Sequence, residues 1–204
     1  MPRKPKHNHG REEILRAALR LFAARGFKGT STAAIAREVG VSQPLIHHHF
    51  GSKEALWQAV VEQSFSRMGE GILEAASGHP PGIERLRALL LALVDQLAAQ
   101  PQAGAILRTE SIAGGSHFDF LYENFIAGLV ALFHRELQAA VDQGLLRPVS
   151  PPVAYSIVIG ACTQPFADAR LMERYFGTQV DDPTFVQAFR EEVVDTLLVG
   201  LAPR

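Results

Sequence analysis

The chain has 204 residues, of which 47% are hydrophobic and 20% are charged, so it can bury a substantial core in one or two domains. Its single cysteine, Cys162, excludes an internal disulfide framework and a zinc site built from several cysteines. No apolar run approaches the ~18–20 residues of a membrane-spanning helix, and the basic N-terminus lacks the apolar segment of a signal peptide. We therefore expect a protein of the reducing cytoplasm that has no membrane partner.

The formal net charge of −1 conceals an asymmetry between the two ends of the chain. Residues 1–53 hold ten Lys or Arg against three Glu, whereas residues 54–204 hold ten Lys or Arg against eighteen Asp or Glu. A positive segment beside a negative body is the distribution that neutralisation of DNA phosphates requires. The split alone is weak evidence for DNA binding, and it becomes strong only with a DNA-binding motif in the same segment.

The N-terminal segment predicts a basic arm followed by a helix. Residues 1–10 are polar, basic and interrupted by proline, which is typical of a disordered arm. Such an arm either keeps the protein soluble or follows DNA into the minor groove. A helix is expected over residues 11–25, where apolar side chains from Ile14 to Phe22 recur on one face, and Gly26 should end it.

The stretch Ser31–Lys53 is the most informative part of the sequence, and it predicts two short helices, a tight turn between them and the start of a third. Its leading serine is placed to cap a helix over residues 32–39. Gly40 then occupies the turn, where the chain needs a left-handed conformation that glycine adopts at little cost. A second capping serine, Ser42, precedes a helix that extends to Phe50.

These two helices are expected to cross closely and to leave one face of the second helix free. Ala36 and Gly40 are small enough for the helices to approach each other. Ile46 and Phe50, four residues apart, anchor the second helix inward. The arrangement is a helix-turn-helix, whose second helix is offered to the major groove of DNA.

Several short runs within residues 11–57 agree, in register and without gaps, with the pattern of a known family. The runs are Gly26-Phe27-x-x-Thr30-Ser31, Ile35-Ala36, Gly40-Val41-Ser42 and Phe50-Gly51-Ser52-Lys53-Glu54-Ala55-Leu56. They resemble the N-terminal domain of the TetR family of bacterial transcriptional regulators. The resemblance implies an all-helical homodimer with a three-helix DNA-binding head and a larger C-terminal domain for ligand binding and dimerisation.

Two positions in the second helix depart from the family pattern. His47 stands where the family usually has a tyrosine that contacts a phosphate. An imidazole is also able to donate to a phosphate, more strongly when it is protonated, which would add a pH dependence. Pro44 stands where the family usually has glycine or another small residue, and we expect it to alter base contacts rather than the fold.

Beyond Ser52 the sequence predicts further helices with short breaks and no strand, so the expected fold is all-α with about nine helices. The expected helices cover residues 53–76, 83–99, 102–112, 116–143, 152–176 and 183–201. Pro165 should kink or break the fifth of these, because proline removes a backbone hydrogen bond. Residues 11–55 are then the helix-turn-helix DNA-binding domain, and residues 56–204 are the ligand-binding and dimerisation domain.

In the DNA-binding domain, the outward side chains receive separate roles. Gln43 is expected to bind a base edge bidentately, preferably adenine, and Pro44 or Leu45 to contact a thymine methyl group. His48 is expected to reach a base or a phosphate. Ordinary capping and a solvated helix face are the alternative, but they do not explain the combined pattern. The candidates for phosphate contacts are Ser31, Thr32, Ser42, His47 and Lys53.

No metal site, cofactor or catalytic site is expected. The run His47-His48-His49 does not converge on one ion, because consecutive helical side chains point about 100° apart. The sequence has no Gly-rich phosphate loop, nucleophile elbow or HExxH pattern. Cys162 lies in an apolar run, which favours a buried structural cysteine over a ligand-sensing thiol.

The body predicts a dimer surface and a ligand pocket. The apolar faces of the helices over 152–176 and 183–201 exceed the needs of one domain and predict a homodimer through a four-helix bundle. The shortage of charge favours a neutral or weakly acidic hydrophobic effector, although any single candidate residue is more often plain core. The candidates for effector binding are Phe65, Met68, Leu90, Val94, Ile106, Leu107, Arg108, Glu110, His117, Phe118, Tyr122, Phe125, Cys162 and Phe166.

Together these patterns predict a ligand-responsive, dimeric repressor of a pseudo-palindromic DNA operator. Residues 43–49 of each protomer would enter a major groove, with half-sites about one helical turn (~34–36 Å) apart or a little more. Effector binding would move the long helix over 53–76 and lower the operator affinity. The alternatives are a small-molecule-binding helical protein with an inactive head, and an enzyme or carrier that uses the body. A steep loss of affinity with salt would favour DNA binding.

Overall fold

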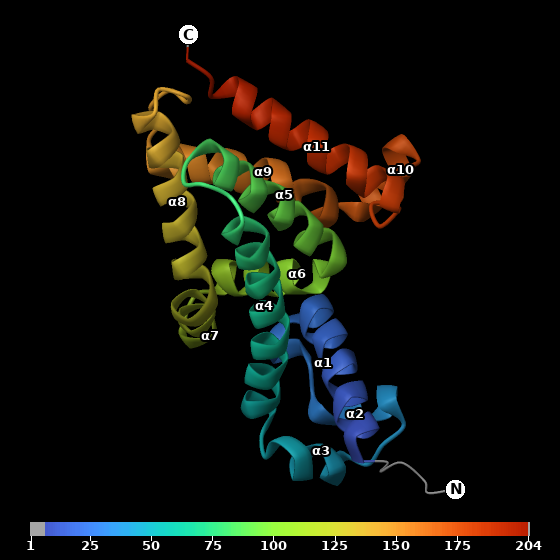
Figure 1. Ribbon diagram of the computed structural model, residues 1–204. Coiled ribbons are helices and arrows are strands. Elements are labelled where there is room, and N and C mark those ends of the chain that lie inside the picture. Colours follow the sequence, from blue (N-terminus) through green and yellow to red (C-terminus); the bar gives the residue numbers. More distant parts are fainter. Residues whose placement is uncertain (1–6, 204) are drawn as a thin grey trace, which may run out of the picture.

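A computed structural model of the chain describes residues 7–203 (Figure 1). These residues form helices and connecting turns with no strand among them, so the predicted all-α fold is confirmed. Residues 1–6 of the expected arm lie outside the described residues, whereas residues 7–10 already belong to the first helix. The elements are α1 (His7–Gly29), α2 (Thr32–Val39), α3 (Gln43–Phe50), α4 (Lys53–Ser77), α5 (Ile83–Ala99), α6 (Pro101–Ala113), α7 (Ser116–Leu121), the π-helical turn η1 (Tyr122–Ile126), α8 (Ala127–Asp142), α9 (Pro151–Ala167), α10 (Ala169–Phe176) and α11 (Pro183–Gly200).

The prediction of about nine helices is close to this arrangement. Two of the predicted helices are divided in the structure, which accounts for the additional elements. The expected helix over 116–143 is a continuous run of α7, η1 and α8. The expected helix over 152–176 divides at Asp168 into α9 and α10. Pro165 lies inside α9 rather than at the break. Because its missing N–H leaves the carbonyl of Ala161 without the usual partner, the last turn is weakened and α9 ends soon afterwards.

Figure 1 shows two parts that α4 joins. The helices α1, α2 and α3 form the head at one end, and α5 to α11 form the body at the other. The helix α4 begins directly after α3 and runs into the body, where it packs against α5, while α1 packs against α6. Among residues 7–203, no helix combines the length and the apolar character that crossing a membrane requires.

The head and the body share one apolar core, which we call the shared core. Its buried side chains include Phe22 and Ile46 in the head, Trp57 on α4, and Ile106 and Leu121 in the body. A second core lies within the body, among α5, α8, α9 and α11. The expected boundary between the two domains therefore crosses a continuous core, and the two parts are mechanically coupled.

A buried carboxylate on α8 binds the turn that connects α4 to α5. The side chain of Glu136 is buried, and its Oε2 accepts a hydrogen bond of 3.0 Å from the N–H of Gly82. Arg135 Nε donates to Oε1 at 3.0 Å, and Arg85 Nη1 lies 3.6 Å from the same oxygen. Burial raises the pKa of Glu136, but the Gly82 N–H and the two arginines outweigh burial and leave the pKa below its ordinary value of 4.5.

Glu136→Gln should lower the free energy of unfolding at neutral pH by roughly 1–3 kcal/mol, because the neutral amide is a poorer partner for the two arginines and Gly82. Folding lowers the pKa of this carboxyl, so its contribution is present above pH 4.5 and is lost as the pH falls further. Urea denaturation followed by circular dichroism, at neutral pH and in acid, measures both effects. The exposed Glu123→Gln is the control. A difference that is the same at every pH would contradict a role for the charge.

Candidate nucleic-acid interface and internal cavity

The turn between α2 and α3 follows from local features of the sequence. The Ser31 hydroxyl accepts a hydrogen bond of 3.1 Å from the N–H of Ala34 and caps α2. Gly40 adopts the left-handed conformation that the turn requires, with φ 73° and ψ 30°. Ser42 holds the N-cap position of α3, but its side chain accepts no capping hydrogen bond from the described residues. The predicted cap of α2 is therefore confirmed, and the predicted side-chain cap of α3 is wrong.

One face of α3 is free, as expected for a recognition helix. Ile46 is buried and Phe50 is half-buried, so these two side chains anchor α3 to the head. Pro44 and His48 are exposed, and Leu45 is half-buried. Figure 1 shows α3 at the end of the head that lies farthest from the body. The outer face of α3 is therefore accessible to a DNA groove.

Besides Ser31, three of the expected DNA-binding side chains are hydrogen-bonded within the head: those of Thr32, Gln43 and His47. Gln43 Nε2 donates to Thr32 Oγ1 at 3.1 Å, and because Thr32 is buried it fixes the position of the exposed amide. His47 Nδ1 lies 3.1 Å from the carbonyl oxygen of Gly51. A carbonyl only accepts, so Nδ1 carries the hydrogen and Nε2 of the neutral ring is an acceptor. His47 then donates to a phosphate through Nε2 only when the ring is protonated.

Two positive groups lie over aromatic rings next to α3. Lys53, half-buried at the start of α4, has its Nζ 4.1 Å from the ring centroid of Phe27. Arg11 lies over Phe50, with 5.2 Å between the guanidinium carbon and the ring centroid. Cation–π contacts of this kind hold a charge in place without neutralising it. Arg11 is a further candidate for a phosphate contact that the sequence did not indicate, because its aromatic partner Phe50 is distant in the sequence.

His47→Phe should weaken the binding of duplex DNA about 3–10-fold, because the phenyl ring cannot donate a hydrogen bond to a phosphate. His47→Tyr keeps an aromatic ring and supplies a hydroxyl donor, so it should bind DNA more tightly than His47→Phe. Fluorescence anisotropy with labelled duplex DNA at constant ionic strength and pH measures the dissociation constant of each variant. Equal affinities of the two variants would contradict a phosphate contact at this position.

A cavity of about 400 Å³ lies in the body, among α4, α5, α6, α8 and α9. Its wall is largely apolar, and Arg108 is its one charged side chain among the described residues. The Thr163 hydroxyl is already engaged, because it donates to a carbonyl of its own helix at 2.7 Å. The polar side chains of the wall are Arg108, Ser111, Tyr155, Thr163 and Gln164.

The structure brings together six of the fourteen side chains that were expected to bind an effector. The six that line the cavity are Phe65, Met68, Leu90, Leu107, Arg108 and Phe166. The other eight lie outside its wall: Val94 and Cys162 in the second core, Ile106 in the shared core, Phe118, Tyr122 and Phe125 on α7 and η1, and Glu110 and His117 between head and body. The wall also contains four apolar side chains that were not predicted, although their three- and four-residue spacing was an available signal: Ile126, Leu129, Val130 and Phe133.

Cys162 is a buried structural cysteine rather than an accessible thiol. Its side chain is buried in the second core, and burial raises the pKa of the thiol to about 12. We expect no reaction with a disulfide reagent such as DTNB at neutral pH while the protein is folded. One equivalent should react in concentrated urea, where the absorbance of the released thiolate reports the reaction. Rapid labelling of the folded protein would contradict the burial.

The fold and these sites define a class of protein: a helical protein with a helix-turn-helix head and a body that encloses an apolar cavity. Residues 14–60 match the family described as "Bacterial regulatory proteins, tetR family". Residues 83–197 match "Tetracyclin repressor-like, C-terminal domain". The chain therefore belongs to the tetR family of bacterial regulatory proteins. The resemblance seen in the sequence is confirmed, and with it the assignment as a DNA-binding transcriptional regulator.

Individual relatives agree along most of the chain. The HTH-type transcriptional regulator RutR of Escherichia coli strain K12 is 28% identical over 198 residues, which cover 95% of this chain and 91% of RutR. The HTH-type transcriptional repressor AcnR of Corynebacterium glutamicum is 33% identical over 151 residues, which cover 72% of this chain and 73% of AcnR.

Solved structures show the same fold at lower sequence identity. The ketosteroid transcriptional regulator KstR2 of Mycobacterium tuberculosis has a TM-score of 0.78 at 19% identity and covers 95% of both chains. The TetR family transcriptional regulator PfmR from Thermus thermophilus has a TM-score of 0.68 at 21% identity and covers 93% of this chain and 99% of its own. At these identities the likeness supports the fold alone.

Proposed function

We propose that this regulator is a dimeric repressor that binds a pseudo-palindromic operator in the bacterial cytoplasm and is released by a small hydrophobic effector. The observation that carries the proposal is the direct connection, through α4, between the free face of α3 and an apolar cavity of about 400 Å³. A ligand that favours one position of α4 would shift the separation of the two heads. The names of two relatives, the transcriptional regulator RutR and the transcriptional repressor AcnR, favour the same function.

The proposed DNA contacts keep the roles expected from the sequence. Gln43 would read a base edge, Pro44 or Leu45 would contact a thymine methyl group, and His48 would reach a base or a phosphate. Thr32 is buried and its hydroxyl accepts a hydrogen bond from Gln43. Its burial therefore favours positioning of Gln43 rather than direct contact with the DNA backbone. The phosphate contacts would come from the other four candidates, Ser31, Ser42, His47 and Lys53.

The proposed dimer would form through α9, α10 and α11, which correspond to the last two predicted helices. Large apolar side chains are exposed on all three, and such patches mark interaction surfaces. A second copy would cover them by forming an isologous interface of the four-helix-bundle type. The exposed side chains are Val153, Tyr155 and Ile157 on α9, Leu171, Tyr175 and Phe176 on α10, and Val199 on α11.

The proposed effector is mainly apolar and carries at most one acidic group. The wall of the cavity is formed mostly by aliphatic and aromatic side chains, so a strongly polar ligand would lose hydration without replacement. Arg108 is the group that would pair with an acidic end, since it lines the cavity while remaining exposed. The remaining apolar candidates of the wall would provide the binding energy.

Selection of bound sequences from random duplex DNA, repeated across a series of salt concentrations, tests the proposal. We expect a pseudo-palindrome with half-sites about one helical turn (~34–36 Å) apart, and an affinity that falls steeply with salt. A folded dimer that recovers no sequence would instead support a small-molecule-binding protein with an inactive head.

Substitutions of Gln43 on α3 and of Lys53 at the start of α4 should separate the reading of base sequence from binding to the DNA backbone. Gln43→Ala should cost ~1–3 kcal/mol of discrimination at one base position and leave the others unchanged. Lys53→Ala should weaken binding to all sequences similarly and reduce the salt slope by about one. Titration of the selected operator and of random DNA with both variants measures these effects. An equal loss on both kinds of DNA in Gln43→Ala would refute base reading by Gln43, and a loss confined to the operator in Lys53→Ala would refute backbone binding by Lys53.

A further inference from the structure

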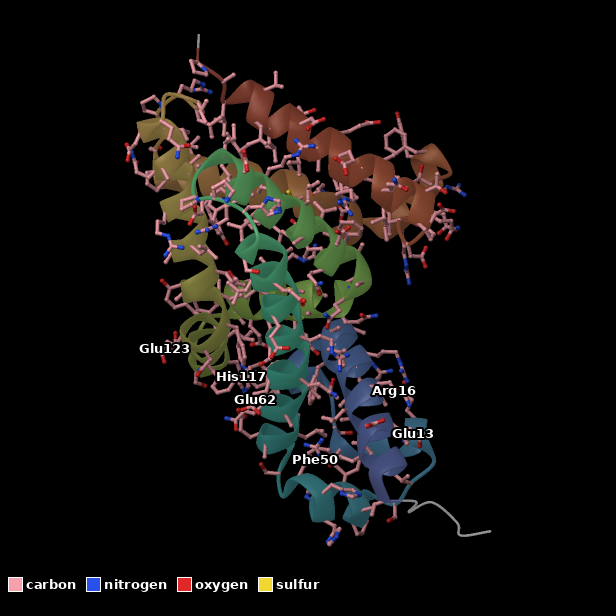
Figure 2. All side chains as sticks on the ribbon, in the orientation of Figure 1. Glu13, Arg16, Phe50, Glu62, His117 and Glu123 are labelled. Atoms are coloured by element: carbon pink, nitrogen blue, oxygen red, sulfur yellow. The ribbon has the colours of Figure 1, made fainter. Side chains whose placement is uncertain are left out.

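A histidine of the body bridges two carboxylates where the head and the body meet. His117, at the start of α7, has its Nε2 3.0 Å from both carboxylate oxygens of Glu54 in the first turn of α4. Its Nδ1 lies 3.7 Å from Oε2 of the buried Glu110 on α6. Figure 2 shows His117 in the region between α7 and α4. We call these three residues the junction triad.

The imidazole of the junction triad is also packed into the shared core. Its ring centroid lies 4.2 Å from that of Trp57 on α4 and 4.3 Å from that of Phe27 at the end of α1. The ammonium group of Lys53 also lies over Phe27, with its Nζ 4.1 Å from the ring centroid. His117 therefore contacts both helices that lead out of the head. Only Gly51 and Ser52 separate α3 from α4, so a displacement of the first turn of α4 passes directly to α3.

The same continuous helix run that carries His117 also forms a wall of the cavity. Ile126, Leu129 and Val130 line the cavity from η1 and α8. Ile126 is the last residue of the π-helical turn η1, and the rest of η1 lies between Ile126 and His117. The hydrogen bonds of a π-helical turn run from i to i+5, so they span one residue more than those of an α-helix. Single π-helical turns inside α-helices are frequent at functional sites. The helix α6 likewise carries both Arg108, in the cavity wall, and Glu110 of the triad.

We propose that His117 is the latch through which the occupied cavity controls the head: filling the cavity displaces η1 and α7, and the His117–Glu54 contact transmits this displacement to α4 and α3. The inference rests on the proposed release by an effector and assigns its route. Two consecutive glycines with positive φ, Gly114 (66°) and Gly115 (87°), connect α6 to α7 and supply the pivot. Control through this contact requires only that the two arrangements differ in ligand affinity.

A cavity-filling substitution serves as the probe, because it needs no identified ligand. Val130→Phe adds volume to the cavity wall, and Val130→Ala is the matched control that removes volume. Operator affinity is measured for each in two backgrounds, wild type and His117→Phe. The phenyl ring keeps the aromatic contacts with Trp57 and Phe27 but forms no hydrogen bond to Glu54. A thermal melt confirms that each variant folds.

We expect Val130→Phe to weaken operator binding at least tenfold in the wild-type background and less than twofold in the His117→Phe background. His117→Gln, whose amide still donates to Glu54, should restore most of the response. Glu54→Ala removes the acceptor of the contact, and it provides a second test if His117→Phe does not fold. It should also reduce the response. The emission of Trp57, the single tryptophan, should shift with Val130→Phe in the wild-type background and stay constant in His117→Phe.

The outcomes separate the latch from the function on which it rests. Equal weakening in both backgrounds would overturn the latch and leave effector control intact. No weakening in the wild-type background would overturn effector control through the cavity, and the latch with it. Loss of the response in His117→Gln, to the same extent as in His117→Phe, would show that ring packing rather than the hydrogen bond matters, and would overturn the assignment to the Glu54 contact.

Discussion

The structure depends on the burial of a single face of α4 along its whole length. The helix has 25 residues and therefore extends about 37 Å. Its buried side chains recur at three- and four-residue spacing, and they enter the shared core at Trp57 and the cavity wall at Phe65, Met68 and Ile72. Because one apolar stripe serves both places, α4 cannot rotate in the head without changing the wall of the cavity.

A single helix would leave the head free to swing, and two further contacts limit that freedom. The packing of α1 on α6 closes a second connection between head and body, with Phe22 and Ile106 in the same buried cluster. Apolar packing of this kind resists separation but tolerates small sliding movements. The hydrogen bond between His117 and Glu54 makes the junction sensitive to the direction of movement, since a hydrogen bond weakens steeply when its geometry changes. The junction is thus firm against separation and sensitive to rotation.

The sequence predicted the helix-turn-helix well because its signals are local. Ser31 and Gly40 act within a few residues of where they stand, so cap and turn follow from the residue types. The contact between His117 and Glu54 was not predicted, because the two residues are 63 positions apart in the sequence. The π-helical turn was not predicted either, because it arises from packing that no short sequence pattern encodes. Within the body, Leu90 and Val94 both pack in the second core, but only Leu90 also lines the cavity. A wide apolar stripe on a helix predicts that its side chains are buried, but it does not show which of them line a cavity.

The free energy gained by burying an apolar ligand in the cavity is comparable to the free energy needed to shift the proposed conformational equilibrium. Moving a two-state equilibrium from 1:99 to 99:1 requires about 5.5 kcal/mol of differential binding. Burial of about 200 Å² of apolar ligand surface, at about 25 cal/mol per Å², gives roughly 5 kcal/mol. This energy is available as a difference only if the cavity is open in one arrangement and collapsed in the other. A polar cavity would bind water in both arrangements, so its affinity for a ligand would differ less between them. We therefore expect Arg108 to orient the ligand, and the apolar wall to supply most of the difference in binding free energy.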